Sequence, residues 1–374
     1  MHRPHGRIGV SMKKAMIAMS GGVDSSVAAA LMIEQGYTCT GVTMKLYQPD
    51  NIEIDGDHSC CTSDDIEDAR QVATSLGMEH EVVDFSARFQ ELVIDRFVAA
   101  YENGCTPNPC VDCNRYLKFD ALFRRAKETG QDLVVTGHYA RVEQDAASGR
   151  YLLKKAINPE KDQSYVLYSL TQEQLAYVRF PLGGMTKAQV RELAEKGGFI
   201  NADKPDSQDI CFVSDGSYAD FLASYTGKTY PPGDFVGPDG KVLGQHKGIV
   251  RYTVGQRKGL GLALPAPLYV TKVDIADNVV RLGNHEDLFS TTLLATNINL
   301  IAVDRMDQPM RLKAKVRYRQ PEQWATVTQL DDDTLKVVFD EPQRAITKGQ
   351  AVVLYDNDVV VGGGTITATA IDGE

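Results

Sequence analysis

The stretch Ser20–Ser26, which reads SGGVDSS, decides the fold of the first part of this chain. The apolar run 14–19 precedes it, as expected for a buried parallel strand, and an Ala- and Leu-rich helix is expected from Val27 to Glu34. In this strand–turn–helix order, the first backbone N–H groups and the positive end of the helix dipole point at one spot, which suits an anion. The paired glycines let the backbone approach that anion closely. The stretch therefore predicts a phosphate-binding loop.

Asp24 is the unexpected member of this loop, because a carboxylate repels phosphate. Its presence is explained if it holds a Mg²⁺ ion that bridges the phosphates. The chain lacks the Gly-x-x-x-x-Gly-Lys pattern of a Walker loop, and residues 227–229 (GKT) copy only its tail. The loop resembles instead the pyrophosphate loop of enzymes that split ATP into AMP and pyrophosphate, which implies ATP and Mg²⁺ as cofactors. An ordinary Gly-Ser turn with Asp24 as a helix cap is the alternative.

The composition of the 374 residues is that of an ordinary globular protein, long enough for two or three domains. No apolar run approaches the length that spans a membrane, and the basic residues 1–7 lack the apolar region of a signal peptide. We therefore expect a cytoplasmic protein with no membrane partner. The net charge of −10 argues against general coating of nucleic acid. Seven cysteines, an odd number, favour reactive or metal-binding thiols over a disulfide framework.

Hydrophobic periodicity divides the chain into three parts. Strands and helices alternate from residue 12 to about 160, which predicts an α/β fold with a doubly wound parallel sheet. Residues 228–283 are rich in Gly and Pro with short apolar runs, which indicates a small β-rich central domain. From about residue 293, period-two alternation with turns at 331–333 and 356–358 indicates a C-terminal β-barrel. We expect domains at 1–215, 216–285 and 286–374.

Ligands of doubly wound sheets bind beyond the carboxyl ends of the strands. At that edge the glycine loop, Met44 at the end of the second expected strand, and residues 136–138 (Thr-Gly-His) would meet. The sequence therefore predicts a composite nucleotide site.

Two groups of basic residues could contact a polyanion. Residues 240–273 hold six basic residues and no acidic one, around a glycine-flexed loop at 255–261 that could follow a phosphate backbone. In the stretch 311–319, basic residues alternate with apolar ones, so a strand would carry all five charges on one face. These five are Arg311, Lys313, Lys315, Arg317 and Arg319. Solvated strand faces are the simpler alternative for both groups, and neither distinguishes RNA from DNA.

The cysteines provide a sharper signal. Residues 106–114 (TPNPCVDCN) form a proline-stiffened loop that presents Cys110 and Cys113 at the start of a helix, where a thiolate is favoured. Cys211 follows the polar linker 201–207 and could fold back over the nucleotide site. One Cys-x-x-Cys pair is too few ligands for a four-thiolate zinc site. The other four cysteines, expected to be buried structural thiols, are Cys39, Cys60, Cys61 and Cys105.

Eight motifs occur together along the chain. They are SGGVDSS at 20–26, TPNPCVDCN at 106–114, TGHY at 136–139, KDQSY at 161–165, DICF at 209–212, GQRKGLG at 255–261, RYRQ at 317–320 and GGG at 362–364. In this order they resemble the tRNA-specific 2-thiouridylases (MnmA family) of the pyrophosphate-loop ATPases, over essentially the whole chain. The resemblance implies a pyrophosphate-loop, HUP-like first domain and two β domains that contact tRNA.

The resemblance also implies a reaction and its partners. ATP adenylates the C2 carbonyl of the wobble uridine, sulfur replaces the oxygen, and AMP and pyrophosphate leave. The expected substrates are the tRNAs for Lys, Glu and Gln. The expected sulfur donor is a cysteine desulfurase or a sulfur-relay protein, which delivers the sulfur as a cysteine persulfide.

Site residues are carried over from the family motif by motif. Cys211 would hold the persulfide, and Cys113 would free the sulfur and close a Cys113–Cys211 disulfide. The residues expected to line the ATP site are Ala18, Met19, Ser20, Gly21, Gly22, Val23, Asp24, Ser25, Met44 and Gly137. The residues expected to contact the flipped base are Asn108, Pro109 and Cys110. Those expected to contact the tRNA elsewhere are Lys161, Asp162, Gln163, Tyr318 and Arg319.

Cys110 departs from the better-known members of the family, which carry Asp at this position. The thiolates of Cys110, Cys113 and Cys211 could instead hold an iron–sulfur cluster whose open iron carries a hydrosulfide. Both sulfur routes stay open, with the persulfide route as the family default. Two other functions fit parts of the sequence: an amide-forming synthetase of the pyrophosphate-loop class, and a non-catalytic, ATP-gated RNA-binding protein. The first gives no reason for the cysteines, and the second would release no AMP.

Overall fold

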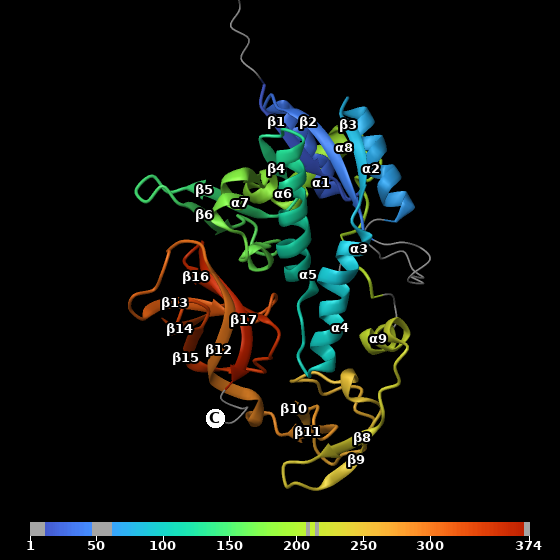
Figure 1. Ribbon diagram of the computed structural model, residues 1–374, viewed down its shortest axis with the longest axis vertical. Helices are drawn as coiled ribbons and strands as arrows, with labels where there is room; N and C mark the ends of the chain where they lie inside the picture. The colour runs from blue at the N-terminus through green and yellow to red at the C-terminus, as the bar shows by residue number, and fades with distance from the viewer. Residues whose placement is uncertain (1–11, 47–61, 207–209, 214–216, 370–374) are drawn as a thin grey trace, which may run out of the picture.

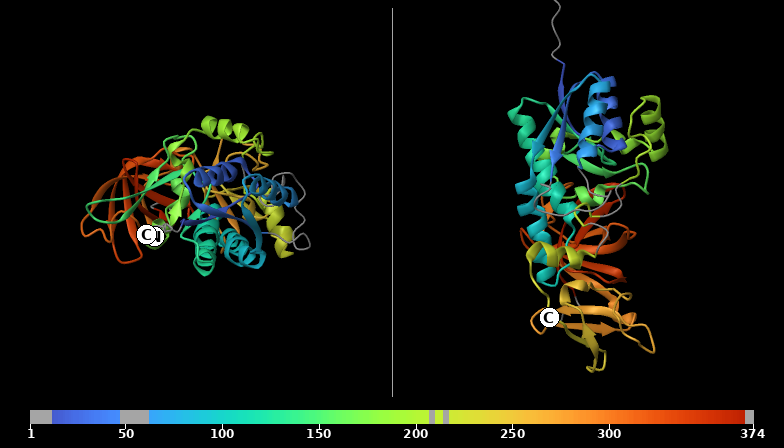
Figure 2. Two further views of the ribbon diagram at one scale, coloured as in Figure 1. Left: turned by 90° about the horizontal axis from the view of Figure 1, so that it is seen from above. Right: turned by 90° about the vertical axis from the view of Figure 1, so that its right-hand side faces the viewer.

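The computed structural model describes residues 12–46, 62–206, 210–213 and 217–369. Three units lie along its long axis: a parallel-sheet unit at one end, a small β unit at the other, and a barrel between them (Figure 1). The side view agrees (Figure 2), and the helical part of the first unit also contacts the small β unit directly, since Lys228 and Tyr230 both bind the carboxylate of Glu102. None of the helices in the described ranges is long and apolar enough to cross a membrane.

The predicted doubly wound sheet is confirmed. Its five strands are all parallel, in the order β3-β2-β1-β4-β7. They are β1 (Lys14–Ala18), β2 (Thr38–Lys45), β3 (Glu79–Asp84), β4 (Leu133–Val135) and β7 (Val178–Arg179). The order reverses between β1 and β4, and α1 (Val23–Glu34) begins at that reversal. The glycine loop therefore lies at the switch point, where sheets of this type bind ligands.

Helices cover both faces of this sheet. The side chains of Ala15 and Ile17 pack on one face with α1, α2 (Ser63–Ser75) and α8 (Lys187–Lys196). Met16 points to the other face, into a cluster with residues of α4 (Asp95–Glu102) and α6 (Phe119–Glu128). Further helices are α3 (Ser86–Phe89), α5 (Pro109–Asp112), α7 (Gln172–Tyr177) and α9 (Tyr218–Thr226), with π-helical segments η1 (Gln90–Ile94) and η2 (Cys113–Lys118). Single 3₁₀ turns are η3 (Ser164–Leu167), η4 (Pro181–Gly184), η5 (Ile249–Arg251) and η6 (Glu286–Leu288).

One part of the expected alternation is wrong. Strands β5 (Ala140–Gln144) and β6 (Tyr151–Lys155) form an antiparallel hairpin that joins the C-terminal barrel through β17 (Val359–Thr369), not the parallel sheet. The physical reason is polarity: β5 (ARVEQ) and β6 (YLLKK) carry charged side chains and each has only one buried residue, whereas an internal parallel strand is apolar on both faces.

The two β units follow. The central sheet has the order β10-β11-β8-β9, with β8 (Gly233–Val236), β9 (Val242–His246), β10 (Tyr269–Asp274) and β11 (Val279–Gly283). The C-terminal strands are β12 (Phe289–Leu300), β13 (Met310–Lys315), β14 (Gln323–Gln329), β15 (Leu335–Arg344), β16 (Ala351–Asp356) and β17. They run in the order β12-β15-β14-β13-β16-β17, and pairing of β12 with β17 closes the barrel. The predicted C-terminal β-barrel and its two turns are confirmed.

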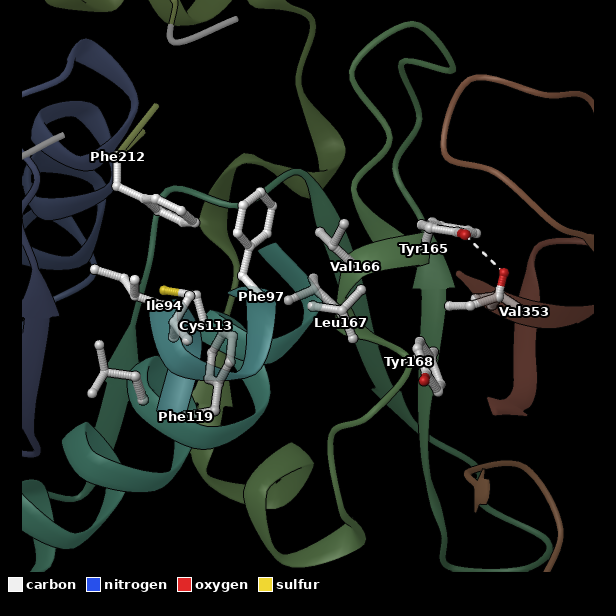
Figure 3. Packing of buried hydrophobic residues seen from close by; sticks show 14 of the residues in the cluster. Ile94, Phe97, Cys113, Phe119, Tyr165, Val166, Leu167, Tyr168, Phe212 and Val353 are labelled. Carbon is white, nitrogen blue, oxygen red and sulfur yellow. Dashed lines mark hydrogen bonds between the residues drawn. The ribbon is translucent and has the colours of Figure 1, made fainter. Parts of the chain in front are cut away.

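One hydrophobic cluster joins all three units. In Figure 3, Phe97, Cys113 and Phe212 lie on the helical side of this cluster, and Tyr165, Tyr168 and Val353 lie toward the barrel. The hydroxyl of Tyr165 donates a 2.8 Å hydrogen bond to the carbonyl of Ala351 in the barrel. Through this buried junction, the helical segment that carries Cys113 and the C-terminal barrel share one hydrophobic core.

Candidate functional site

The glycine loop is shaped for close approach. Gly21 has φ +73°, and a Cβ at this position would lie 2.3 Å from the carbonyl oxygen of Asp65, so a side chain cannot be accommodated. A Cβ at Gly137 would lie 2.8 Å from the backbone nitrogen of Ser25 in the first turn of α1. The N-cap residue of α1 is Gly22, which has no side chain to accept hydrogen bonds from the first backbone N–H groups of the helix. These N–H groups are therefore available to an anion. The glycine loop and residues 136–138 thus meet, as the composite site requires.

Asn201 holds this loop from the buried side. Its Nδ2 donates to the carbonyl of Gly21 (2.9 Å) and to Oγ of Ser26 (3.0 Å), while its Oδ1 is buried without a hydrogen-bond partner among the described residues. The sequence indicated only a polar linker here. No local pattern distinguishes a buried asparagine from a solvated one, and this contact was therefore missed.

An ionic chain leads away from Asp24. Its Oδ1 accepts hydrogen bonds from the hydroxyl of Tyr139 and from Nζ of Lys187, both at 2.7 Å. Lys187 also pairs with Asp206 at 2.6 Å, and Asp206 pairs with Lys161 at 2.7 Å. Burial raises the pKa of Tyr139 and the charge of Asp24 adds to this effect, so the phenol remains a donor. The sequence around Lys187 did not indicate a contact with Asp24. Lys187 is simply the first residue of α8, after the N-cap Thr186.

A Mg²⁺ ion fits this arrangement only together with phosphate oxygens. Among the described residues, no group of three or more His, Cys, Asp or Glu side chains could hold a metal ion. Magnesium is commonly bound by one or two carboxylates plus substrate phosphates, and Asp24 supplies such a carboxylate at the helix N-terminus. The same finding applies to the iron–sulfur cluster: in this structure the thiols of Cys110, Cys113 and Cys211 do not form a group that could hold a metal ion.

His138, in the TGHY motif, gives a pH prediction. Burial, with a smaller contribution from Lys118, lowers the pKa of His138 to about 3. In the unfolded chain a histidine takes up its proton near pH 6.5, so stability falls as the pH drops from 6.5 toward 3. Between pH 7 and pH 5 this one residue should cost about 2 kcal/mol of unfolding free energy. Urea unfolding of His138→Gln at both pH values should show a pH dependence smaller by that amount.

The matched control for this prediction is His285→Gln, since His285 is exposed and lies far along the chain near β12. It should keep the pH dependence of the parent protein. If His138→Gln and His285→Gln behave alike, the imidazole of His138 is not the group responsible.

The cysteine motif begins a helix, as predicted. Asn108 is the N-cap of α5, with Oδ1 accepting from the backbone N–H of Val111 at 3.3 Å, and Pro109 occupies the first turn. Cys110 is exposed, whereas Cys113, one turn later, is only 8% exposed and packs in the cluster of Figure 3. Of the three residues expected to contact the flipped base, Pro109 is buried, Asn108 is half-buried and Cys110 is exposed.

Cys211 is half-buried against the same cluster as Cys113. Its neighbour Phe212 anchors this segment by edge-to-face contacts with Phe97 (5.1 Å) and Phe89 (5.8 Å). All five cysteines in the described ranges are thiols in this structure, so the expected Cys113–Cys211 disulfide stays a prediction. Cys39 is a buried structural thiol, with its pKa raised to about 11 by burial. Cys60 and Cys61 lie outside the described residues.

The turn 161–163 connects the glycine loop to the barrel. Gln163 and Tyr139 exchange two 2.9 Å hydrogen bonds, one of them through Oε1 of Gln163. The hydroxyl of Tyr318 donates to the carbonyl of Asp162 at 3.2 Å. Burial raises the pKa of Tyr318, and the nearby charges of Asp162 and Cys110 contribute. The carboxylate of Asp162 accepts from the Ser164 hydroxyl at 2.8 Å, so it shapes the turn.

The predicted five-charge strand face is wrong. Strand β13 ends at Lys315, so only Arg311, Lys313 and Lys315 share its outward face. Arg317 turns inward, where its Nη2 donates to the carbonyl of Ala345 (2.9 Å) and to the hydroxyl of Thr347 (2.8 Å). The chain bends after β13, so the guanidinium of Arg317 hydrogen-bonds inside the protein and does not join the outward row of charges.

The basic group of the central unit is partly neutralised. Arg251 pairs with Asp220 at 2.5 Å, and Lys241 pairs with Asp239 at 2.6 Å. Arg257 and Lys258 are exposed in the glycine-flanked loop. The acidic partners of Arg251 and Lys241 lie outside the window 240–273, which is why the window looked uniformly basic.

A cavity of about 320 Å³ lies behind α5, between α4 and the barrel. Its polar lining includes Arg96, Asn108, Asp112 and Tyr168. Burial raises the pKa of Asp112 to about 6, partly offset by Arg96 and Arg115. Cys110, Cys113 and Cys211 do not line this cavity, so the thiols face elsewhere.

Comparison with known proteins shows matches along the whole chain. Residues 13–215 match the family model described as tRNA methyl transferase HUP domain, 219–284 its PRC-barrel domain, and 290–366 an aminomethyltransferase beta-barrel domain. The tRNA-specific 2-thiouridylase MnmA of Clostridioides difficile (strain 630) is 50% identical over 355 residues, which are 95% of this chain and 98% of that protein. That of Acetivibrio thermocellus is 48% identical over 361 residues, which are 96% and 100% of the two chains.

Solved structures are more distant. A 4-thiouridine synthetase in complex with RNA and bound ATP is 20% identical with a TM-score of 0.34, covering 57% of this chain and 50% of that one. The NMN synthetase from Francisella tularensis is 19% identical with a TM-score of 0.33, covering 59% and 80%. At these TM-scores neither structure carries an argument about this chain.

Proposed function

This chain belongs to the tRNA-specific 2-thiouridylases, a family of tRNA sulfurtransferases, and we propose that it uses ATP to replace O2 of the wobble uridine by sulfur. One observation carries the proposal: residues far apart in sequence form a continuous set of contacts from the nucleotide loop to the expected tRNA surface. The set runs from Asp24 through Lys187 to Asp206 and Lys161, and from Asp162 to Tyr318. Adenylation of a tRNA base needs ATP and RNA to meet at one place.

In the proposed first step, the N-terminus of α1 and the loop around Gly21 bind the phosphates of ATP. Asp24 would hold the Mg²⁺ ion that neutralises them. The C2 carbonyl oxygen of the uridine attacks the α-phosphate, pyrophosphate leaves, and O2 becomes part of an adenylate. This activation is needed because an unmodified carbonyl oxygen is a poor leaving group.

In the proposed second step, Cys211 carries a persulfide received from a cysteine desulfurase or a sulfur-relay protein. Its terminal sulfur bonds to C2, and AMP leaves with the former O2. The thiolate of Cys113 then attacks Sγ of Cys211, which breaks the S–S bond, leaves the sulfur on the base and forms a Cys113–Cys211 disulfide. An external thiol must reduce that disulfide before the next turnover. The shared hydrophobic cluster of Cys113 and Cys211 supports this pairing.

The two sulfur routes make opposite predictions for iron. We expect iron-free protein supplied with a persulfide donor to form 2-thiouridine at the full rate, because the described thiols form no metal-binding group. Cys110→Ala should retain activity within a few-fold, as should its control Cys105→Ala. The measurement is iron and acid-labile sulfide per chain after strictly anaerobic purification, with 2-thiouridine formation in the same sample. Iron that tracks with activity and is lost in Cys110→Ala would overturn the persulfide route.

The same proposal covers tRNA contact and substrate range. We propose that Cys110, Lys161 and Gln163 face the base and anticodon loop, together with Tyr318 and Arg319. Arg319 is exposed beside Tyr318, and Lys161 is held by Asp206. The proposed substrates are the tRNAs for Lys, Glu and Gln, and 2-thiouridine analysis of isolated tRNAs from a deletion strain tests that range.

A further inference from the structure

Trp324 is the only tryptophan of the chain, and it lies on the outside of the barrel. It stands on β14 with 49% of its surface exposed, while its neighbours Ala325 and Val327 are fully buried in the barrel core. In the sheet register it is paired with Lys313 on β13. A large aromatic ring held in water on a rigid strand is costly to expose, so it suggests a partner.

Two cations flank this ring. The guanidinium of Arg311 lies 5.2 Å from the ring centroid, and Nζ of Lys313 lies 5.5 Å from it. Asp340 forms a two-bond pair with Arg311, and Glu322 lies 3.6 Å from Lys313, so both cations are oriented by acidic neighbours. The remaining outward positions near the ring are threonines, Lys336 and Val338. The face therefore combines one exposed aromatic ring with lysine and arginine side chains, two of which are paired with carboxylates.

The same strand leads to the proposed reaction site. Lys315 is the next outward residue of β13, about 7 Å beyond Lys313 by the rise of a strand. Its ammonium group lies 5.7 Å from the ring of Tyr318 and 5.8 Å from that of Tyr165. Tyr318 in turn contacts Asp162 of the turn 161–163. An outward row of cations thus runs from Trp324 to the place where the target base is proposed to bind.

We propose that Trp324 is a stacking platform for an unpaired base of the tRNA anticodon loop, next to the target uridine, with Lys313 and Lys315 contacting the adjoining phosphates. Proteins bind single-stranded RNA by this combination, with bases on aromatic faces and cations along the backbone. Exposed tryptophan and arginine side chains are also enriched in protein–protein interfaces. The outward cations that continue from Lys313 to Lys315, beside Tyr318, favour RNA over a protein partner because they can follow a phosphate backbone. The inference rests on the proposed function, since it assumes tRNA as substrate.

The single tryptophan makes a direct test available. The full chain is excited at 295 nm, which avoids the tyrosines, and titrated without ATP with an unmodified anticodon stem-loop RNA. Stacking of a base on Trp324 should quench the fluorescence saturably. A fully paired RNA duplex of equal length should not quench it. Absence of quenching by the stem-loop at concentrations where it is shown to bind would overturn the proposal.

Affinity measurements complete the test. Loss of one base–aromatic stack should raise the Kd of Trp324→Ala for the stem-loop by about 5- to 100-fold, while Trp324→Phe should keep most of the affinity. Leu330→Ala, at a similarly exposed residue just after the end of β14, should bind like the parent protein. In turnover, Trp324→Ala should raise the KM for tRNA and leave kcat unchanged, because the ring touches no reacting atom.

The outcomes separate this inference from the proposed function. Quenching by the stem-loop in a protein that forms no 2-thiouridine would support the platform and contradict the function. Normal 2-thiouridine formation with unchanged KM in Trp324→Ala would support the function and contradict the platform. A fluorescence change caused by the sulfur-donor protein, and not by RNA, would assign the surface to a protein partner and overturn the proposal.

Discussion

Cys211→Ala and Cys113→Ala should each lower 2-thiouridine formation about 1000-fold or more, while both variants still bind tRNA and still transfer AMP to it. The methyl group of alanine can neither carry a sulfane sulfur nor attack a disulfide, so the covalent step has no substitute. Adenylation precedes sulfur transfer and uses neither thiol. The measurements are 2-thiouridine in digested tRNA and incorporation of label from α-labelled ATP into tRNA.

Two cysteine variants serve as matched controls. Cys39→Ala replaces a buried thiol, as Cys113→Ala does, and Cys105→Ala replaces a half-buried thiol, as Cys211→Ala does. Burial raises the pKa of Cys39 to about 11, so it is protonated and inert. Both controls should keep activity, and thermal unfolding should show that all four variants fold. Full 2-thiouridine formation in both Cys113→Ala and Cys211→Ala would contradict the proposed roles of the two thiols.

Asp24→Asn should lower AMP formation by about 100- to 1000-fold and leave tRNA binding within twofold of the parent protein. Asparagine keeps the shape of the side chain and one acceptor for the Tyr139 hydroxyl, but it removes the negative charge. The proposed Mg²⁺ ion then loses its only protein carboxylate in the loop, and the charge developing on the leaving pyrophosphate is less well neutralised. AMP release in the presence of tRNA and filter binding of labelled tRNA measure the two effects.

The control for Asp24→Asn is Asp68→Asn. Asp68 is also a partly buried carboxylate paired with a lysine, Lys204, but it lies on α2 and outside the glycine loop. Its variant should form AMP at the parental rate. Parental AMP formation in Asp24→Asn would contradict the proposed magnesium role. AMP formation abolished equally in both variants would point to loss of the ion pairs around the loop and not to a metal.

Local features were predictable because neighbouring residues determine them. The predicted strand–turn–helix around Ser20–Ser26 was correct, with β1 before the loop and α1 after it. Hydrophobic period correctly predicted the parallel sheet and the closed barrel. The prediction of one charged strand face over residues 311–319 was wrong, because β13 ends at Lys315. The alternation of basic and apolar residues continues past that end, where Arg317 turns into the protein.

The sequence by itself determined the architecture, the nucleotide loop and the family. Each of these depends on short stretches of neighbouring residues and on the order of those stretches along the chain, so none of them requires knowledge of tertiary contacts. Only the tertiary structure revealed that Lys187 lies against Asp24, 163 residues away, and that Asn201 supports Gly21, 180 residues away. It also showed that the hairpin 140–155 extends the barrel and that Trp324 lies on a cationic row leading to Tyr318. The physical reason is common to all of these: an ion pair, a buried amide or a surface row depends on which distant segments pack together, and residue periodicity carries no information about that choice.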